Sequence, residues 1–213
     1  MNRTLIEALN KRYATKLFDK NRKISKQNLE TIIETARLTP TSYGLQLMKM
    51  VVIEDLKLRE KLLSHSYHQQ QVVDASHLLV LCSYSSFDVK HIDNYINNIS
   101  KIRELDVNSK QLQGFKEMLK RFRENSNIEQ LKHWMKNQQY IVLGNILTAC
   151  ALLNIDACPM EGFIPEKYDD ILELDKEGLN SVLVIPIGYA SNDDKYKNLK
   201  KVRVSTEDFV LYK

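Results

Sequence analysis

Residues 138–163 read QQYIVLGNILTACALLNIDACPMEGF, and this stretch gives the strongest indication of the fold. The helix predicted over 128–153 begins amphipathic and becomes apolar on nearly every side. Such a helix is normally buried in a large core or in a subunit interface. In a chain of 213 residues we favour the interface, so the pattern predicts a homodimer. A short strand over 155–159 follows the helix.

Helices and strands alternate along the rest of the chain. Ser25 is a predicted N-cap, and the helix after it carries apolar residues at helical spacing and ends before Pro40. The run HLLVLCSY at 77–84 is typical of a strand buried on both faces. The other predicted helices cover 4–11, 89–105 and 109–123 and the stretches after Asp55 and Pro165; the other strands cover 48–53 and 181–187, and the tail 200–213 is irregular. No repeat or linker divides residues 1–213, so we expect one domain of the α+β class.

The composition of the chain narrows the classes of function that it can have. The net charge of +4 comes from 31 basic and 27 acidic residues spread along the chain, a distribution that does not favour nucleic acid but suits an anionic cofactor. The three cysteines have no CxxC spacing, which favours a reducing compartment and a cytoplasmic protein. The longest apolar segment, 140–155, is too short and too interrupted to span a membrane. His65 and His68 have no third ligand pattern, so we expect no metal.

The common nucleotide-binding and hydrolytic motifs are missing from the sequence. It contains no GxGxxG fingerprint, no GxxxxGK[ST] phosphate loop, no GxSxG elbow and no HExxH pair. If the protein binds a nucleotide, side chains from separate parts of the sequence must hold the phosphate.

Four local clusters are candidates for such a site. They are RYATK at 12–16, PTSYGLQ at 40–46, PMEGF at 159–163 and KKVR at 200–203. Each has an ordinary structural explanation: cations at a helix end complement its dipole, and glycine and proline form turns. No cluster decides the function by itself.

The order and spacing of these segments together resemble the nitroreductase family of FMN-dependent oxidoreductases along nearly the whole chain. RYATK resembles the first flavin segment of that family, and PTSYGLQ its loop before the first core strand. The stretches 67–82 and 138–163 are also similar to family segments. KVR at 201–203 falls where the family places a basic pair for the phosphate.

The resemblance implies a nitroreductase-like α+β fold, with a central mixed or antiparallel sheet surrounded by helices. Two chains would interlock as an intertwined homodimer, and the C-terminal arm of each would cross to its partner. Two FMN molecules would lie at the interface, each touched by both subunits.

The resemblance also assigns the residues near the phosphate and the flavin ring. Arg12, Lys201 and Arg203 would hold the FMN phosphate and the nearby ribityl chain. Tyr13 and Ala14 belong to the same first segment, and Lys16 would lie near the pyrimidine edge of the ring.

Three further groups complete the predicted flavin site. The other protomer would contribute Thr41, Ser42 and Gly44, with Gln46 close by. Polar contacts to the ring or ribityl would come from His68, Gln71 and Gln138. The backbone of the segment beside the ring would donate toward flavin N5; its residues are Pro159, Met160, Glu161 and Gly162.

The implied chemistry is hydride transfer from NADH or NADPH through the flavin to nitroaromatics, quinones or similar small acceptors. The flavin carries the hydride, so no side-chain acid or base is required, and Lys16 would give electrostatic support. Two alternatives stay open: a flavin-binding protein without efficient turnover, and a specialised reductive dehalogenase or flavin-modifying enzyme on the same fold. A structural dimer without flavin would contradict all of them.

Some positions depart from the family pattern. Tyr13 and Ala14 stand where many relatives carry His and Ser, and Gly44 stands where Asn is frequent. We expect the divergent region 89–134 to cover the substrate side of the flavin.

Overall fold

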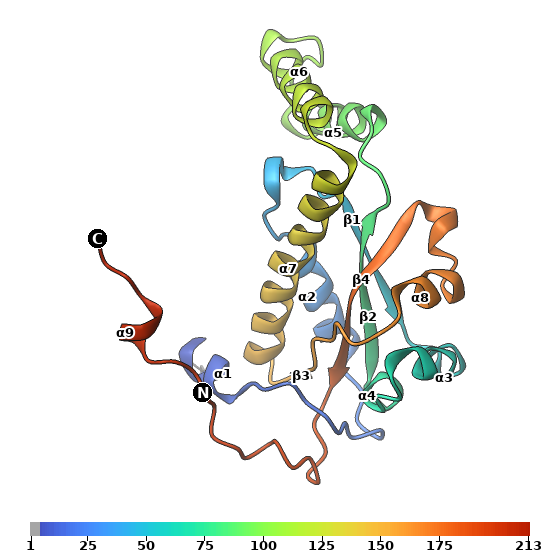
Figure 1. Cartoon of the computed structure of the whole chain (residues 1–213), viewed down its shortest axis with the longest axis vertical. Coiled ribbons are helices and arrows are strands. Elements are labelled where there is room, and N and C mark those ends of the chain that lie inside the picture. The colour runs from blue at the N-terminus through green and yellow to red at the C-terminus, as the bar shows by residue number, and fades with distance from the viewer. Residues whose placement is uncertain (1–4) are drawn as a thin grey trace.

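A four-stranded antiparallel sheet forms the centre of the computed structural model, which describes residues 5–213 (Figure 1). Every strand pairing in this described part of the chain is antiparallel, with the order β1-β2-β4-β3. The strands are β1 (Met48–Ile53), β2 (His77–Tyr84), β3 (Asp156–Ala157) and β4 (Leu179–Gly188). The arrangement confirms the predicted α+β class, and β1 and β2 have the bounds that the sequence predicts.

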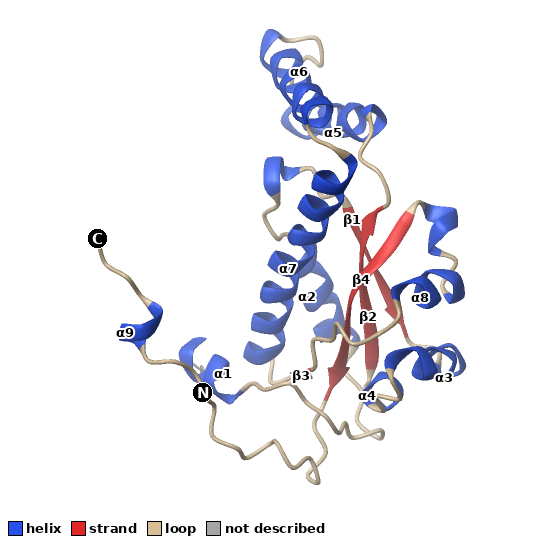
Figure 2. Ribbon diagram, in the orientation of Figure 1, coloured by secondary structure: helices blue, strands red, loops and turns tan. Residues whose placement is uncertain are grey.

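One face of the sheet is covered by α2 (Lys26–Arg37) and α7 (Ile128–Leu152), which pack against each other (Figure 2). Ser25 caps α2 as predicted, because its side chain accepts a hydrogen bond from the backbone N–H of Asn28. The apolar stripe of α7 packs with strand residues such as Leu183 and Ile185. This layer places the long apolar helix directly against the sheet.

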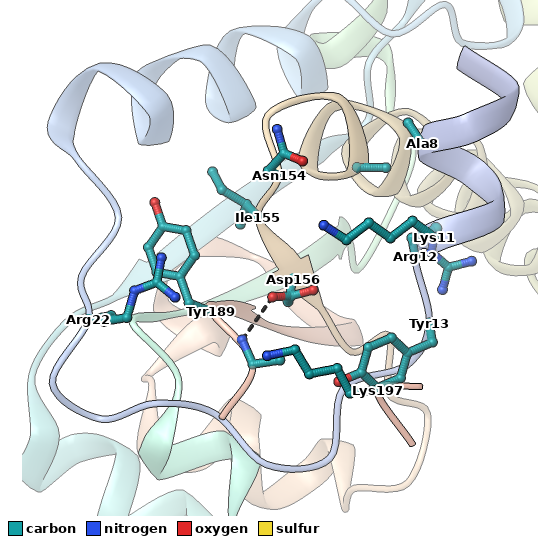
Figure 3. A pocket seen from close by; sticks show the side chains of 12 residues that line it. Ala8, Lys11, Arg12, Tyr13, Arg22, Asn154, Ile155, Asp156, Tyr189 and Lys197 are labelled. Atoms are coloured by element: carbon teal, nitrogen blue, oxygen red, sulfur yellow. Dashed lines mark hydrogen bonds between the residues drawn. The ribbon is translucent and has the colours of Figure 1, made fainter. Parts of the chain in front are cut away.

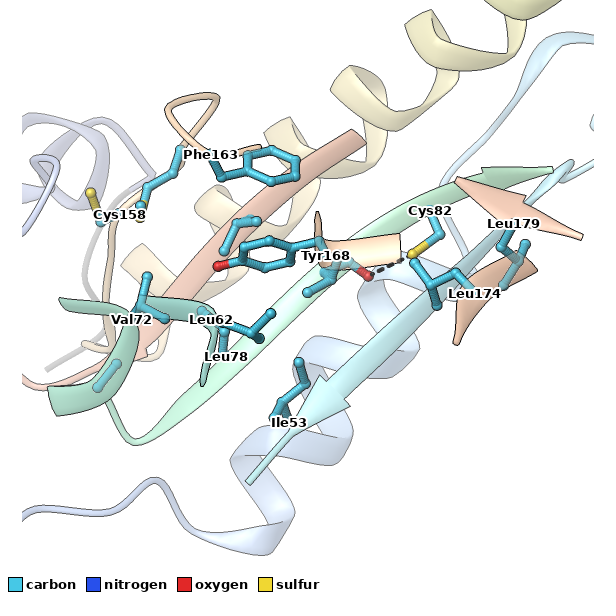
Figure 4. Close-up of a cluster of buried hydrophobic side chains, with 14 of the residues drawn as sticks. Ile53, Leu62, Val72, Leu78, Cys82, Cys158, Phe163, Tyr168, Leu174 and Leu179 are labelled. Carbon is cyan, nitrogen blue, oxygen red and sulfur yellow. Dashed lines mark hydrogen bonds between the residues drawn. The ribbon is translucent and has the colours of Figure 1, made fainter. Parts of the chain in front are cut away.

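The opposite face is covered by α3 (Leu56–Leu63), α4 (Gln71–Asp74) and α8 (Pro165–Ile171). Tyr168 lies at the centre of this second core and is fully buried (Figure 4). Its hydroxyl shares a 2.7 Å hydrogen bond with Ser66, so the buried polar atom is satisfied.

A separate helical lobe stands at one end of the sheet (Figure 1). It consists of α5 (Val89–Arg103), α6 (Lys110–Asn125) and the first turns of α7. Phe87, Phe122 and Trp134 pack together inside it, with ring centroids 5.0–6.5 Å apart. The lobe is built largely from residues 89–134, the stretch that we expect to cover the substrate side of the flavin.

The first helix and the C-terminal end of the chain lie on the same side of the molecule (Figure 1). The first helix, α1 (Leu5–Lys11), packs on α7 through buried Ala8, whereas Leu5 is 48% exposed. The first residue of the predicted helix, Thr4, lies outside the described residues. After β4 the chain continues as an arm that is irregular, as expected, apart from the one-turn helix α9 (Thr206–Phe209).

Strand β3 is shorter than predicted. The apolar run at 155–159 suggests five residues, but only Asp156 and Ala157 pair with β4. The chain continues beside β4 in the same register, because the Cys158 N–H donates to the Pro186 carbonyl and Met160 forms an isolated bridge to Val184, but Pro186 has no N–H to complete the ladder. Within residues 5–213, no helix combines the length and the apolar character needed to cross a membrane.

Candidate functional site

A strongly basic cavity of about 380 Å³ lies between the segment after α1 and the C-terminal arm. Five lysines and two arginines line it, and none of the described residues on its wall is Asp or Glu. The cations are Lys11, Arg12, Lys16, Lys197, Lys200, Lys201 and Arg203. The cavity therefore brings together all the cations that the sequence assigns to the phosphate.

The electrostatics of this cavity favour an anion. Burial, and then the charge of nearby Arg203, lower the pKa of Arg12 below its ordinary value. Burial also lowers the pKa of Lys201, and both arginines lower it further. The Lys201 ammonium donates a hydrogen bond to the backbone carbonyl of Arg12, which holds the arm against the first segment. Cations that repel one another in this way are stabilised by an anion such as a phosphate.

Asp194 holds several residues of the cavity wall in place, although it does not line the cavity itself. Its Oδ2 accepts hydrogen bonds from the Tyr13 hydroxyl at 3.0 Å and from the backbone N–H groups of Lys16 and Leu17 at 2.9 and 3.1 Å. Its Oδ1 accepts from the Tyr196 N–H at 3.0 Å. Burial disfavours the charged carboxylate, but these N–H donors outweigh it and hold the pKa of Asp194 below its usual value. No local pattern in the sequence marks this residue.

A smaller cavity of about 260 Å³ adjoins the first and has a different charge balance (Figure 3). Lys11, Lys197 and Arg22 surround the carboxylate of Asp156, whose Oδ2 accepts from the Ala190 N–H at 2.8 Å. The Arg22 guanidinium stacks on the ring of Tyr189, 4.0 Å from its centroid. Four cations and one carboxylate line this cavity, so it is positive too, but less so than the larger cavity with its seven cations.

The segment after α1 then runs beside β3. The Thr15 N–H donates to the carbonyl of Ala157 at 3.4 Å, and Ala14 forms a parallel bridge to the same residue. This pairing brings Lys16 Nζ to 3.7 Å from the Sγ of Cys158, and Gln71 Nε2 reaches the same sulfur at 3.8 Å. Cys158 is fully buried, and its burial raises the pKa of the thiol. Lys16 and Gln71, which the resemblance assigns to the surroundings of the flavin, therefore both approach the neutral thiol of Cys158.

The loop over 159–162 is held at several points. Met160 exchanges two backbone hydrogen bonds with Val184, at 2.8 and 3.1 Å. The side-chain amide of Gln69 donates to the carbonyl of Gly162 at 2.8 Å, and the Tyr140 hydroxyl donates to the carboxylate of Glu161. Sequence reasoning missed Gln69 and Tyr140, although both lie inside segments that resemble the family.

The side chains at the edge of this loop are open to solvent. Glu161 and Gly162 are exposed, and Pro159 is half-buried. His68 is also exposed, on a backbone with a φ of 55°. The carboxylate of Glu161 accepts a hydrogen bond from the Tyr140 hydroxyl, so it is engaged within the chain.

The loop over 41–46 lies elsewhere in the chain. The Ser42 N–H donates to Gln138 Oε1 at 2.9 Å, the Gln46 N–H donates to Thr41 Oγ1 at 3.2 Å, and the Gln46 amide donates to the carbonyl of Arg37 at 2.7 Å. Gln138 and Tyr140 are two residues apart on α7, and therefore about 200° apart around its axis. The loops over 41–46 and 159–162 thus approach α7 from opposite sides, so one chain does not bring the predicted residues of these two loops together.

Comparison with known proteins identifies the family. A model described as the nitroreductase family matches residues 9–189. A protein of Staphylococcus saprophyticus, named as an inferred NAD(P)H nitroreductase, is 34% identical over 99% of this chain and 97% of its own length. A similarly named Staphylococcus aureus protein is 36% identical over 99% of this chain and 96% of its own. The chain belongs to the nitroreductase family, which confirms the resemblance seen in its sequence.

Solved structures confirm the fold. An inferred nitroreductase of Bacillus subtilis, ydfN, superposes with a TM-score of 0.86 at 22% identity, over 98% of both chains. An inferred nitroreductase of Exiguobacterium sibiricum, solved in complex with FMN, has a TM-score of 0.82 at 20% identity, over 99% of this chain and 98% of its own.

Proposed function

We propose that this protein binds FMN and uses it to pass hydride from NADH or NADPH to small electron-poor acceptors. The observation that carries the proposal is the cavity of about 380 Å³ whose wall has seven cations and no carboxylate among the described residues. A protein that binds FMN must provide a binding site for its dianionic phosphate. This sequence contains no glycine-rich phosphate loop. The dispersed cations fit that need.

The residues divide into a phosphate end and a ring end. Arg12, Lys201 and Arg203 would hold the phosphate, which relieves the mutual repulsion that lowers the pKa values of Arg12 and Lys201. Lys16 lies between this cluster and Cys158, so its ammonium would stabilise negative charge at the ring. When bound, FMN supplies the site that accepts and gives hydride.

The backbone beside the ring would come from the loop over 159–162. Its bonds to Val184, Gln69 and Tyr140 hold it in one place before any ligand arrives. A backbone donor held in this way costs little reorganisation when it orients the ring. Gln71 and His68 lie on the neighbouring segment and would supply further polar contacts.

We propose a homodimer with one flavin site at each end of the interface. The loop over 41–46 faces away from the loop over 159–162, so its hydroxyls would serve the flavin of the partner protomer. The arm exposes large apolar side chains that a monomer would leave in water: Val202, Val204, Phe209, Leu211 and Tyr212 are 67–87% exposed. The arm would bury them by crossing to the partner.

Two further observations support the electron donor and the compartment. The Staphylococcus relatives are named for NAD(P)H, and a Staphylococcus epidermidis protein with a TM-score of 0.83 is named as an inferred NAD(P)H:FMN oxidoreductase. All three cysteines of this chain are free and buried, which favours a reducing compartment such as the cytoplasm.

An anaerobic absorbance titration of the purified protein tests the proposal. The expected result is a pair of flavin bands that bleach on adding NADH or NADPH and return on adding a quinone or a nitroaromatic. Bands that stay oxidised with both nucleotides would point to a flavin-binding protein without turnover. A protein that takes up no flavin when FMN is supplied would overturn the proposal.

A further inference from the structure

The loop over 41–46 has an unusual backbone. Tyr43, Gly44 and Gln46 have φ angles of 57°, 72° and 48°, all in the left-handed region. Tyr43 and Gln46 are not glycines, and such conformations persist only where the surrounding structure enforces them. The loop therefore needs contacts that hold it in place.

Tyr95 of α5 makes the tightest of these contacts. Its hydroxyl donates a hydrogen bond to the carbonyl of Tyr43 at 2.8 Å. A Cβ atom added at Gly44 would lie 2.3 Å from the Tyr95 hydroxyl oxygen and 3.3 Å from Cζ. A distance of 2.3 Å is far inside van der Waals contact, so only glycine at position 44 admits this placement of Tyr95.

The helical lobe supports the same loop from a second direction. The ring of Tyr43 packs on Phe122 of α6 and Trp134 of α7, with centroid distances of 5.2 and 6.4 Å. The loop thus takes its shape from α5, α6 and α7 together. The hydrogen bond from the Ser42 N–H to Gln138 completes the set.

We propose that Tyr95 is a positioning residue for the loop over 41–46 and that Gly44 is the residue that admits it. The proposal deepens the proposed function and rests on it, because the loop matters for catalysis only if it serves the partner's flavin. The Tyr95 hydroxyl occupies the space that a Cβ atom at position 44 would need.

We call the contact between the Tyr95 hydroxyl and Gly44 the lock. Three variants and one control test it. Gly44→Asn introduces the clash, Tyr95→Phe removes only the hydroxyl, and the double variant combines both changes. Asn is chosen because it tolerates the left-handed region better than most residues. The control is Gly114→Ala in α6, where an added Cβ meets no atom within 4 Å. Each protein is compared for its FMN dissociation constant, its melting temperature and its tryptophan emission without flavin.

Trp134 makes the flavin-free measurement specific, because it is the single tryptophan of the chain and lies beside the ring of Tyr43. Gly44→Asn should shift its emission and weaken FMN binding about tenfold or more. The double variant should recover part of both effects, because without the hydroxyl the nearest atom to a Cβ at position 44 is the ring Cζ at 3.3 Å. Tyr95→Phe alone should weaken binding a few-fold with little change in melting temperature. Gly114→Ala should match the wild type in FMN affinity and in tryptophan emission, and should melt at a slightly higher temperature.

The outcomes separate this inference from the proposed function. An unchanged Trp134 emission in Gly44→Asn, or a double variant no better than Gly44→Asn, would overturn the lock. If Gly44→Asn does not fold, Tyr95→Phe decides: binding and emission equal to wild type would overturn it. If the wild type binds no FMN while the emission follows the expected pattern, the lock stands and the proposed function fails.

Discussion

The Tyr13 hydroxyl donates to Asp194 across 181 positions of sequence, at 3.0 Å. The same carboxylate oxygen accepts the N–H groups of Lys16 and Leu17. One buried carboxylate thereby ties the base of the C-terminal arm to the segment that carries Arg12 and Lys16. The geometry of the basic cavity depends on this attachment.

We expect Asp194→Asn to lower the free energy of unfolding by about 1–3 kcal/mol, because its amide can turn an N–H toward the backbone donors and leave one unsatisfied. Tyr13→Phe removes a single bond and should cost about 0.5–1.5 kcal/mol. Urea unfolding of both variants measures the difference. An Asp194→Asn protein as stable as the wild type would show that the carboxylate does not hold the arm.

The same residue predicts an acid dependence. The folded protein holds the pKa of Asp194 below its unfolded value, so the carboxylate stabilises the fold above about pH 4, and this contribution is lost as the pH falls through the folded pKa. Stability measured at several acidic pH values should therefore fall more steeply for the wild type than for Asp194→Asn. Parallel curves for the two proteins would contradict the assignment.

The affinity for FMN should weaken in alkali. The pKa of Lys201 lies below the ordinary lysine value, so its ammonium loses its proton at a lower pH than an exposed lysine would. FMN dissociation constants measured between about pH 7 and pH 10 should rise. Lys201→Arg should delay the rise, because a guanidinium stays charged over that range. A pH dependence identical in both proteins would exclude Lys201 as its source.

Two glycines should respond to alanine in opposite directions. A Cβ at Gly188 would lie 2.9 Å from the Ser76 backbone nitrogen and 3.0 Å from Phe18, so Gly188→Ala should cost about 1–3 kcal/mol of stability. Gly114 lies in α6 with open space around it, and Gly114→Ala should add about 0.5–1 kcal/mol. Thermal unfolding distinguishes them, and a neutral Gly188→Ala would show that the sheet end relaxes easily.

Much of the fold could be predicted from local patterns. The runs at 48–53 and 77–84 are apolar, short and bounded by polar residues, and both strands have the predicted ends. The helix after Ser25 begins where its cap predicts. The strand predicted over 155–159 is wrong in length because Pro186 of β4 has no N–H to return the hydrogen bond that Cys158 donates to it, which interrupts the regular pairing after Ala157.

Only those site residues could be predicted that lie in segments whose order along the chain resembles the family. Arg12, Lys16, Lys201 and Arg203 were predicted from segments in the family order, and the structure brings them to one cavity. Asp194, Gln69, Tyr140 and Tyr95 were missed, because each acts through a contact with a residue at least 21 positions away. Such contacts follow from the assembled fold and leave no periodic signal in the sequence.

We propose above all that the basic cavity binds the FMN phosphate. The most direct test compares FMN with riboflavin, which lacks the phosphate, in the wild type and in Arg12→Ala/Arg203→Ala, by fluorescence titration. The wild type should bind FMN about a hundredfold more tightly or better, since two charge-assisted contacts are at stake. The double variant should lose most of that preference while its riboflavin affinity stays nearly unchanged. Equal binding of the two flavins by the wild type, or a preference that survives the double substitution, would contradict the account.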